Sequence, residues 1–238
     1  MSSYTARPGP VPGTSLWRVA AEGDANEAFR VLPDAAMDVV CFRGELLFAG
    51  PDTTAMLVPS FKDAATWGLR FSPGLAPSLL GVSADDVVNQ RIALHELLRV
   101  PPAALDAAYF DPAEALELVA VELWQRVAPD PAVLNLACSL DSSARKGASV
   151  QYMSEHFGLS QRTLLRFSSR VFGYGLKTLM AIHRFQRALD LSRTGAAIRD
   201  VAAGARYADQ AHLSREARRF SGVTFRHLID GASQTTNR

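Results

Sequence analysis

The side chains best suited to recognising another molecule are arginines and glutamines that recur at a fixed spacing in the last third of the chain. Moving the sequence along itself by 49 positions superimposes two sets of residues, Gln161, Leu164, Arg166, Arg170 and Gly173 on Gln210, Leu213, Arg215, Arg219 and Gly222. Arg and Gln form paired hydrogen bonds with guanine and adenine edges in the major groove of DNA. The repeat therefore predicts two equivalent segments that read nucleic acid.

Two helices are needed to position these side chains. In each repeat, apolar residues recur at i, i+3 and i+7 and the arginines lie on the opposite side, as in an amphipathic helix. A shorter helix is expected before each one; Ser149 and Gly158 bound the first of these. Ser160 and Asp209 can cap the two reading helices. A short helix, a turn and a capped second helix make a helix-turn-helix, and a long helix over about 176–193 joins the two units.

These residues belong to a longer pattern: Gly158-Leu159-Ser160-x-Arg162-x-Leu164-x-Arg166, Gly173, Arg184-Phe185-Gln186-Arg187-Ala188, Asp209-Gln210-x-His212-x-x-Arg215 and Gly222-x-Thr224. The pattern resembles the DNA-binding domain of AraC/XylS-type transcriptional regulators and covers about residues 147–230. The resemblance implies a bacterial transcription regulator whose two units enter adjacent turns on one face of double-stranded DNA.

The resemblance also implies which side chains meet the DNA. Base readout is expected from Gln161, Arg162, Thr163 and Arg166 in the first unit and from Gln210, Ala211, His212 and Arg215 in the second. Contacts to phosphates, which position a protein without reading sequence, are expected from Arg170, Arg218 and Arg219. Asp209, at the start of the second reading helix, completes the expected DNA-binding set.

Three residues depart from the family pattern. Ser168 and Ala217 stand where the family places Phe, and we expect Phe167 and Phe220 to refill the core because i+3 and i+7 share a helix face with i+4. Arg206 stands where the family has a turn glycine, so a positive φ there would strain the second unit. These departures leave an alternative open, an interaction protein whose drifted domain acts mainly through a protein partner.

Charge divides the chain into two parts. Residues 144–238 carry 16 Lys or Arg against 6 Asp or Glu, whereas residues 1–143 carry 9 against 18. A strongly basic segment attracts the phosphate backbone of nucleic acid. The acidic part should avoid DNA and is better suited to a small-molecule effector, whose identity is unknown, or to protein partners.

The first third of the chain has short apolar runs between turn residues, which predict strands. They lie at 29–32, 37–42, 45–48, 55–58 and 67–71, with hairpin turns at Arg43-Gly44 and Gly50-Pro51-Asp52. The segments Leu32-Pro33-Asp34, Met37-Asp38, Ala49-Gly50-Pro51-Asp52-Thr53 and Gly68-x-Arg70-Phe71-x-Pro73-Gly74 resemble a cupin-like domain found in some AraC-type regulators. Helical patterns follow at 77–80, 84–89 and 92–98.

Two matched helix starts follow, Asp111-Pro112 and Asp130-Pro131, each an acidic cap before Pro. The helices should reach about Val127 and Leu140. They either make a dimer contact, as the family often does, or cover the sheet. The fold class is therefore α+β, divided into a flexible arm over 1–13, a β-rich regulatory domain with a helical pair over 14–141, a linker over 142–149, the DNA-binding domain over 150–231 and a flexible tail over 232–238.

The residues predict no enzyme chemistry, no cofactor and no metal site. A metal-binding cupin needs several converging His or carboxylate ligands, and no His precedes His95. The two cysteines lack the spacing of a zinc site, and no apolar run is long enough to span a membrane. We therefore expect a cytoplasmic transcription regulator. Its expected partners are DNA, a small-molecule effector, RNA polymerase and a second copy bound through the N-terminal half.

Overall fold

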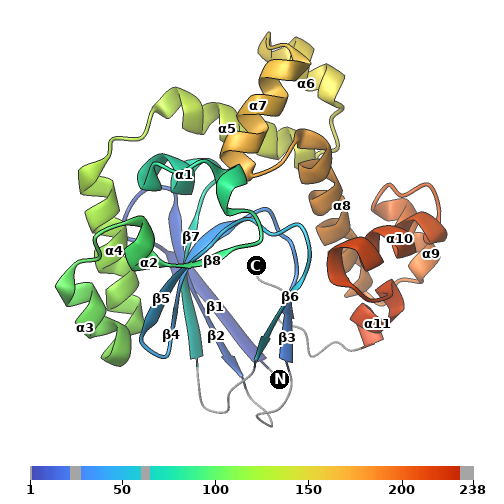
Figure 1. The fold of residues 1–238 in the computed structure, drawn as a ribbon. Coiled ribbons are helices and arrows are strands. Elements are labelled where there is room, and N and C mark those ends of the chain that lie inside the picture. Colours follow the sequence, from blue (N-terminus) through green and yellow to red (C-terminus); the bar gives the residue numbers. More distant parts are fainter. Residues whose placement is uncertain (1, 22–27, 60–64, 231–238) are drawn as a thin grey trace.

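The computed structural model describes residues 2–21, 28–59 and 65–230 (Figure 1). The chain is α+β, with a β-rich N-terminal part, a helical extension and an all-helical C-terminal part, which confirms the predicted fold class. The predicted flexible tail over 232–238 lies outside the described residues. Within the described ranges, no helix is long and apolar enough to cross a membrane.

Six antiparallel strands form the main sheet in the order β1-β2-β7-β4-β5-β8. They are β1 (Ser2–Pro8), β2 (Thr14–Ala21), β7 (Ala65–Phe71), β4 (Met37–Phe42), β5 (Glu45–Ala49) and β8 (Arg91–Ala93). A separate ribbon of β3 (Ala28–Val31) and β6 (Met56–Pro59) lies between this sheet and the last helices of the chain (Figure 1). The N-terminal part is thus β-rich, as the cupin-like resemblance implied.

The prediction of a flexible arm over 1–13 is wrong. Strand β1 occupies the edge of the main sheet and pairs with β2, with Tyr4 opposite Val19. The Gly and Pro residues that suggested an unstructured arm are concentrated in the hairpin turn, where the Gly9 amide donates to the Thr14 carbonyl (3.0 Å). Tyr4 and Thr5 favour a strand, so the turn signal did not extend to the residues before it.

The Arg43-Gly44 hairpin is confirmed. Both residues have positive φ, 52° and 84°, as expected of a primed two-residue turn. The turn predicted at Gly50-Pro51-Asp52 is not a hairpin, because β5 pairs with β8 and β6 pairs with β3. The segment 50–55 instead carries the chain from the main sheet to the ribbon. The helix expected over 92–98 is present but shorter, as Leu94–Leu97, because residues 91–93 form strand β8, which pairs with β5.

Short helices and one long helix cover the main sheet. They are α1 (Leu75–Leu80), the 3-10 helix η1 (Ala84–Val87), α2 (Leu94–Leu97), α3 (Pro102–Phe110) and α4 (Pro112–Arg126). The Asp111 carboxylate accepts from the Glu114 amide (3.1 Å), as its predicted cap role requires. The apolar side of α4, which includes Leu116 and Val119, is buried against the sheet. Helix α4 therefore covers the sheet, one of the two roles left open for the helical pair.

The first half of the predicted linker over 142–149 is helical. Helix α5 (Pro131–Arg145) continues through it, and Leu140 and Ala144 are buried in the C-terminal core. The small polar residues fit the helix because the Ser143 hydroxyl donates to the Ser139 carbonyl (2.8 Å). The two parts of the chain are therefore joined by a helix that packs on the C-terminal core, and only a short turn over 146–149 follows it.

Six helices form the C-terminal part around a common core: α6 (Val150–Phe157), α7 (Gln161–Phe172), α8 (Leu176–Ser192), α9 (Ile198–Gly204), α10 (Gln210–Ser221) and α11 (Phe225–Asp230). The expected refilling of this core holds for Phe220, which is fully buried, but Phe167 is only half-buried. In the first unit the buried Ser168 hydroxyl donates to the Tyr174 carbonyl (2.6 Å). A hydrogen bond thus replaces the missing aromatic there.

Candidate nucleic-acid interface

The first helix-turn-helix consists of α6 and α7. The Ser149 hydroxyl accepts from the Tyr152 amide (3.0 Å) and starts α6, and Gly158 ends it in the left-handed conformation, with φ of 64°. The Ser160 hydroxyl then accepts from the Thr163 amide (3.1 Å) and starts α7. These caps satisfy amides that a helix leaves unpaired at its start. The local sequence therefore fixes the angle at which α7 leaves the turn.

The second unit consists of α9 and α10 and repeats this arrangement with different residues. The Asp209 carboxylate accepts from the His212 amide (2.6 Å), so it caps α10 as predicted. Arg206 in the turn has φ of 64°, the strained conformation that the missing glycine suggested. Its guanidinium reaches out of the unit and donates to the Lys146 carbonyl (2.6 Å), immediately after α5. That bond could not be foreseen from the local pattern.

The structure places the predicted contact residues on two exposed helix faces. On α7 all five are exposed, and on α10 all are exposed except His212, which is half-buried; they are Gln161, Arg162, Thr163, Arg166, Arg170, Gln210, Ala211, His212, Arg215, Arg218 and Arg219. Asp209 is also exposed, but its carboxylate is already used as a cap. His212 packs edge-on against the Tyr207 ring, with centroids 5.1 Å apart.

The arginines of these faces differ in the contacts that their side chains make. Within the described residues, Arg162, Arg166, Arg215 and Arg218 make no ion pair or hydrogen bond through their side chains. Arg170 and Arg219 hold equivalent positions near the two helix ends and lie over Phe167 and Phe220, 5.9 and 5.1 Å from the ring centroids. Exposed, unpaired guanidiniums are the groups that a phosphate backbone or a base edge can recruit.

Other arginines of the same domain serve the fold. Arg184 on α8 makes two hydrogen bonds to the carboxylate of Glu216 on α10 (3.2 and 2.6 Å) and lies over the Tyr207 ring. Arg187 donates to the Gly204 carbonyl (2.9 Å). The Arg184–Glu216 pair connects α8, the helix that joins the two units, to the buried side of α10. The reading face of α10 therefore stays free while its opposite face is fixed.

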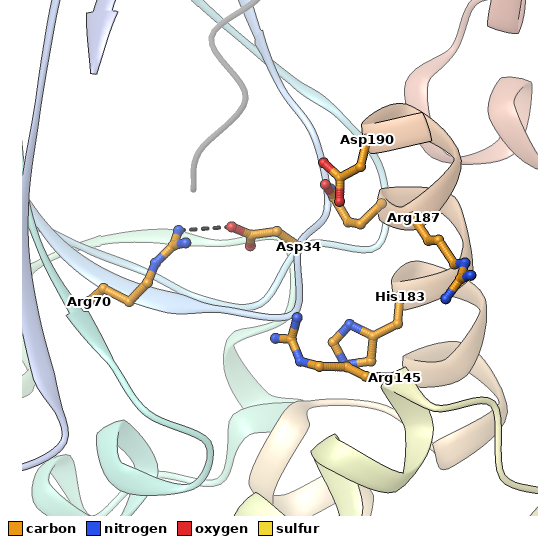
Figure 2. A pocket seen from close by; sticks show the side chains of 7 residues that line it. Asp34, Arg70, Arg145, His183, Arg187 and Asp190 are labelled. Carbon is orange, nitrogen blue, oxygen red and sulfur yellow. Dashed lines mark ion pairs between the residues drawn. The ribbon is translucent and has the colours of Figure 1, made fainter. Parts of the chain in front are cut away.

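A second candidate site lies between the two parts of the chain. A cavity of about 220 Å³ is lined by Asp34, Arg70, Arg145, His183, Gln186, Arg187 and Asp190 (Figure 2). The first two come from the β-rich part, Arg145 from α5 and the others from α8. A neighbouring cavity of about 280 Å³ shares Asp34, Arg70 and Arg145. Both parts of the chain thus contribute charged groups to one polar space.

One buried polar atom at this cavity has no hydrogen-bond partner, His183 Nδ1. Arg70 makes two hydrogen bonds with Asp38 (3.0 and 3.1 Å) and also forms an ion pair with Asp34 Oδ2 (2.8 Å), which Figure 2 shows as a dashed line. Burial raises the pKa of Asp34 although the Arg70 charge opposes this.

The other nitrogen of His183 joins two helices. Its Nε2 lies 2.7 Å from Asp141 Oδ1, and Arg145 donates to Oδ2 of the same carboxylate (2.7 Å). Burial disfavours the charged form of Asp141, but the hydrogen bond and charge of His183, together with Arg145, lower its pKa overall. His183 is therefore a packed imidazole, and the Asp141–His183 pair fastens α5 to α8.

In the described part of the chain no group of three or more His, Cys, Asp or Glu side chains could hold a metal ion. Cys41 is buried in β4 and Cys138 is exposed on α5. Asp34 Oδ1 accepts from the Ala36 amide (3.1 Å) and so stabilises the turn after it. Asp38 instead accepts from Arg70 and from the Trp17 indole N–H (3.0 Å).

Comparisons with known proteins agree with the C-terminal geometry. Residues 153–230 match a family described as a helix-turn-helix domain, and residues 14–93 match a domain of unknown function, DUF6597. No curated protein matches the chain. Among solved structures, an apo variant of ToxT from Vibrio cholerae has 10% identity and a TM-score of 0.48, covering 94% of this chain and 99% of that chain.

A second ToxT structure from Vibrio cholerae also has 10% identity, with a TM-score of 0.44 and 97% of each chain covered. The family match coincides with α6 to α11, the segment that carries the two capped reading helices. Residues 153–230 therefore form a helix-turn-helix domain of the AraC type, the kind of domain with which DNA-binding transcription regulators bind DNA.

Proposed function

We propose that α7 and α10 bind double-stranded DNA side by side and that the N-terminal half modulates this binding. The observation that supports it is the pair of equivalent capped helices, each exposing arginines that make no ion pair within the described residues. Base readout then falls to Gln161, Arg162, Thr163, Arg166, Gln210, Ala211, His212 and Arg215, and phosphate contact to Arg170, Arg218 and Arg219. Such a regulator acts in the bacterial cytoplasm, where it recruits or blocks RNA polymerase.

The test is binding of the full chain to a duplex selected from a random pool, followed by fluorescence anisotropy at increasing salt. Each phosphate contact lowers the slope of log affinity against log salt by about 0.9. We expect a steep loss of affinity with salt, because many arginines contribute. Binding that is absent, or that does not weaken with salt, would contradict the proposal.

The cavity between the two parts supports a sensing role for the N-terminal half. It brings three guanidiniums, two carboxylates and an imidazole from both parts to one place, and the buried His183 Nδ1 lacks a partner. A buried polar atom without a partner costs about 1–3 kcal/mol, and a small polar effector could satisfy it. The effector would then bind α8 and the β-rich part together.

Native mass spectrometry of the purified chain tests this sensing role. A retained small molecule in the wild type should be lost in Arg187→Ala, which removes a cavity guanidinium, and kept in Arg199→Ala, which removes an exposed one on α9. Because Arg187 also holds the Gly204 carbonyl, circular dichroism must show the variant folded. Equal retention by both variants would exclude this cavity as the binding site.

An exposed apolar surface favours a second candidate role, contact with another protein. Leu105, Tyr109 and Phe110 on α3 are 46, 69 and 92% exposed. Neither helix of the pair expected to dimerise carries this surface, so a homodimer formed through the N-terminal half would use α3. Light scattering on wild type and Phe110→Asp tests this: a dimer that the substitution dissociates supports it, and an unchanged mass opposes it.

A further inference from the structure

We propose that the N-terminal part fixes the distance and angle between the two reading helices by holding both at the same point, the glycine turn where each helix ends. The segment that does this is the connection from β5 to β6, residues 50–55, which we term the bridge segment. It works together with Arg30 on β3. The consequence for operator spacing rests on the proposed DNA binding, whereas the geometric part does not.

The first reading helix ends against the bridge segment. Gly173 follows α7 with φ of 84°. A side chain added there would lie 2.6 Å from the Pro51 ring, 2.8 Å from the Val88 side chain and 3.0 Å from the Ala84 carbonyl. Only glycine permits this close approach. The end of α7 is therefore packed directly on the β-rich part.

The second reading helix ends on the same segment and on β3. The Ala55 amide donates to the Phe220 carbonyl (2.7 Å), and the Arg30 guanidinium donates to the Ser221 carbonyl (2.5 Å). The last carbonyls of a helix have no partner within it, and a cation at that end also interacts favourably with the helix dipole. Gly222 ends α10 in the left-handed conformation, and the N-terminal part supplies donors for two of its last carbonyls.

These contacts lie at the equivalent ends of the two repeats, at Gly173 in the first and at Phe220 and Ser221, directly before Gly222, in the second. A segment of four steps, from Pro51 to Ala55, reaches at most about 14 Å, so it limits how far the two helix ends can separate. The segment is itself held rigidly. The Thr53 amide donates to Asn89 Oδ1 (2.7 Å), and the Asn89 amide donates to the Pro51 carbonyl (3.0 Å).

An ion pair strengthens the same anchor. Asp52 accepts two hydrogen bonds from Arg91 on β8 (3.1 and 2.6 Å), and both side chains are largely buried. The bridge segment is therefore fastened to the main sheet in its middle and to one reading helix at each end. Such a segment acts as a spacer of fixed length between the two units.

A spacer of fixed length should restrict which separations of DNA half-sites the protein can bind. Two helices that enter successive major grooves on one face must present their N-terminal, base-contacting ends about one helical turn of DNA apart, roughly 34 Å, so the angle fixed at their C-terminal ends matters. A rigid spacer selects one half-site separation and one relative angle. Loosening it should widen the range of separations that the protein accepts, while leaving the base contacts of each unit unchanged.

The geometric part is tested without DNA, by electron–electron distance measurements between spin labels. The labels are attached at Leu165→Cys on α7 and Ala211→Cys on α10, in a Cys138→Ser background; Cys41 is fully buried. We expect a narrow distance distribution for this parent and a broader one for Arg30→Ala. Arg7→Ala removes the same charge from exposed strand β1, and should leave the distribution narrow.

Two further variants keep the proposal falsifiable if Arg30→Ala unfolds. Arg30→Lys should keep most of the narrow distribution, since it retains the cation at the helix end. Insertion of two glycines between Thr53 and Thr54 leaves Arg30 intact but lengthens the spacer, so the mean distance should shift or broaden. Distributions identical to the parent in the insertion variant, or in a folded Arg30→Ala, would overturn the spacer.

The effect on DNA binding is tested by measuring affinity for duplexes in which the separation of the selected half-sites is changed one base pair at a time. Wild type should prefer one separation sharply, and the insertion variant should show a loss of that preference. If wild type binds no duplex, the proposed function fails and the spin-label distances still decide on the spacer. If both proteins bind with the same sharp preference, DNA binding stands and the spacer is refuted.

Discussion

The two helix-turn-helix units share a reading helix but differ in how their turns are made. Gly158 and Arg206 adopt the same left-handed conformation, each with φ of 64°. Gly158 lies two residues before its cap Ser160, whereas Arg206 lies three residues before Asp209. Glycine adopts this conformation without strain, but another residue there costs about 1–3 kcal/mol. The first unit is therefore self-sufficient at its turn, and the second relies on groups outside it.

Three hydrogen bonds connect the second unit to groups outside it. Arg206 donates to the Lys146 carbonyl, Arg30 donates to the Ser221 carbonyl, and the Ala55 amide donates to the Phe220 carbonyl. The first unit has its own Ser149 and Ser160 caps and packs on the N-terminal part where α7 ends. A duplication can thus preserve the recognition face while the support of each copy moves elsewhere in the molecule.

The largest expected difference between the units is in core packing. Phe220 is fully buried and lies 5.4 Å from Phe185 between ring centroids, while Phe167 is half-buried. Phe220→Ala should therefore lower the free energy of unfolding by about 3–5 kcal/mol, and Phe167→Ala by clearly less. Urea unfolding of both variants measures this. Equal losses would show that the two cores are packed alike.

Base readout should give the next largest effect. Arg166→Ala and Arg215→Ala should each weaken binding to the selected duplex by about 1–3 kcal/mol and relax discrimination at one position. Arg219→Ala should weaken binding to all duplexes about equally, because phosphate contacts carry no sequence information. Anisotropy on matched and mismatched duplexes separates the two classes. Identical behaviour of all three variants would refute the division of roles.

The pH dependence of stability tests the Asp141–His183 pair, which connects α5 to α8. The pKa of Asp141 is lowered in the folded chain, so its stabilising contribution is complete above the unfolded value of about 3.9. That contribution is lost as pH falls through the folded pKa. Between pH 5 and about 3, wild type should lose more stability than Asp141→Asn, as followed by the urea midpoint. Parallel pH profiles would mean that this pair contributes no pH dependence.

The sequence predicted the local features and missed those that depend on distant contacts. Caps at Ser149, Ser160 and Asp209, and the boundaries of α6, depend on neighbouring residues and were predicted correctly. The predicted linker failed because small polar residues tolerate a helix whose stability comes from Leu140 and Ala144 packing on α8. A fragment starting at Ser143 would lose Ala137 and Leu140 from this core and most of α5, so an isolated C-terminal domain should begin at Pro131.

The candidate sites also divide into features set by neighbouring residues and features set by distant contacts. The exposure of the reading faces follows from helical periodicity, which a sequence displays directly. The cavity between the two parts and the bridge segment join residues more than a hundred positions apart, and no local pattern encodes such pairings. Arg206 is an intermediate case: its strain was predicted from a missing glycine, but its compensating bond to Lys146 depends on where α5 ends.

The smallest expected effect, and the sharpest test of the difference between the two turns, comes from substitutions at Arg206. Arg206→Gly removes both the strain and the bond to the Lys146 carbonyl; a hydrogen bond involving a charged group contributes about 1.5–3 kcal/mol. The two terms nearly cancel, so stability should change by less than about 1 kcal/mol. Arg206→Ala keeps the strain and loses the bond, so it should be the less stable of the two.

Arg206→Lys adds an intermediate case to this series of stabilities. Lys keeps the positive charge but cannot reproduce the geometry of the guanidinium. Its stability should fall between that of Arg206→Ala and wild type. Gly158→Ala is the matched change in the first unit: it introduces the same strain with no atom within 4 Å to compensate. Urea unfolding of the four variants tests the order. If Arg206→Gly were as unstable as Arg206→Ala, the turn of the second unit would not be strained.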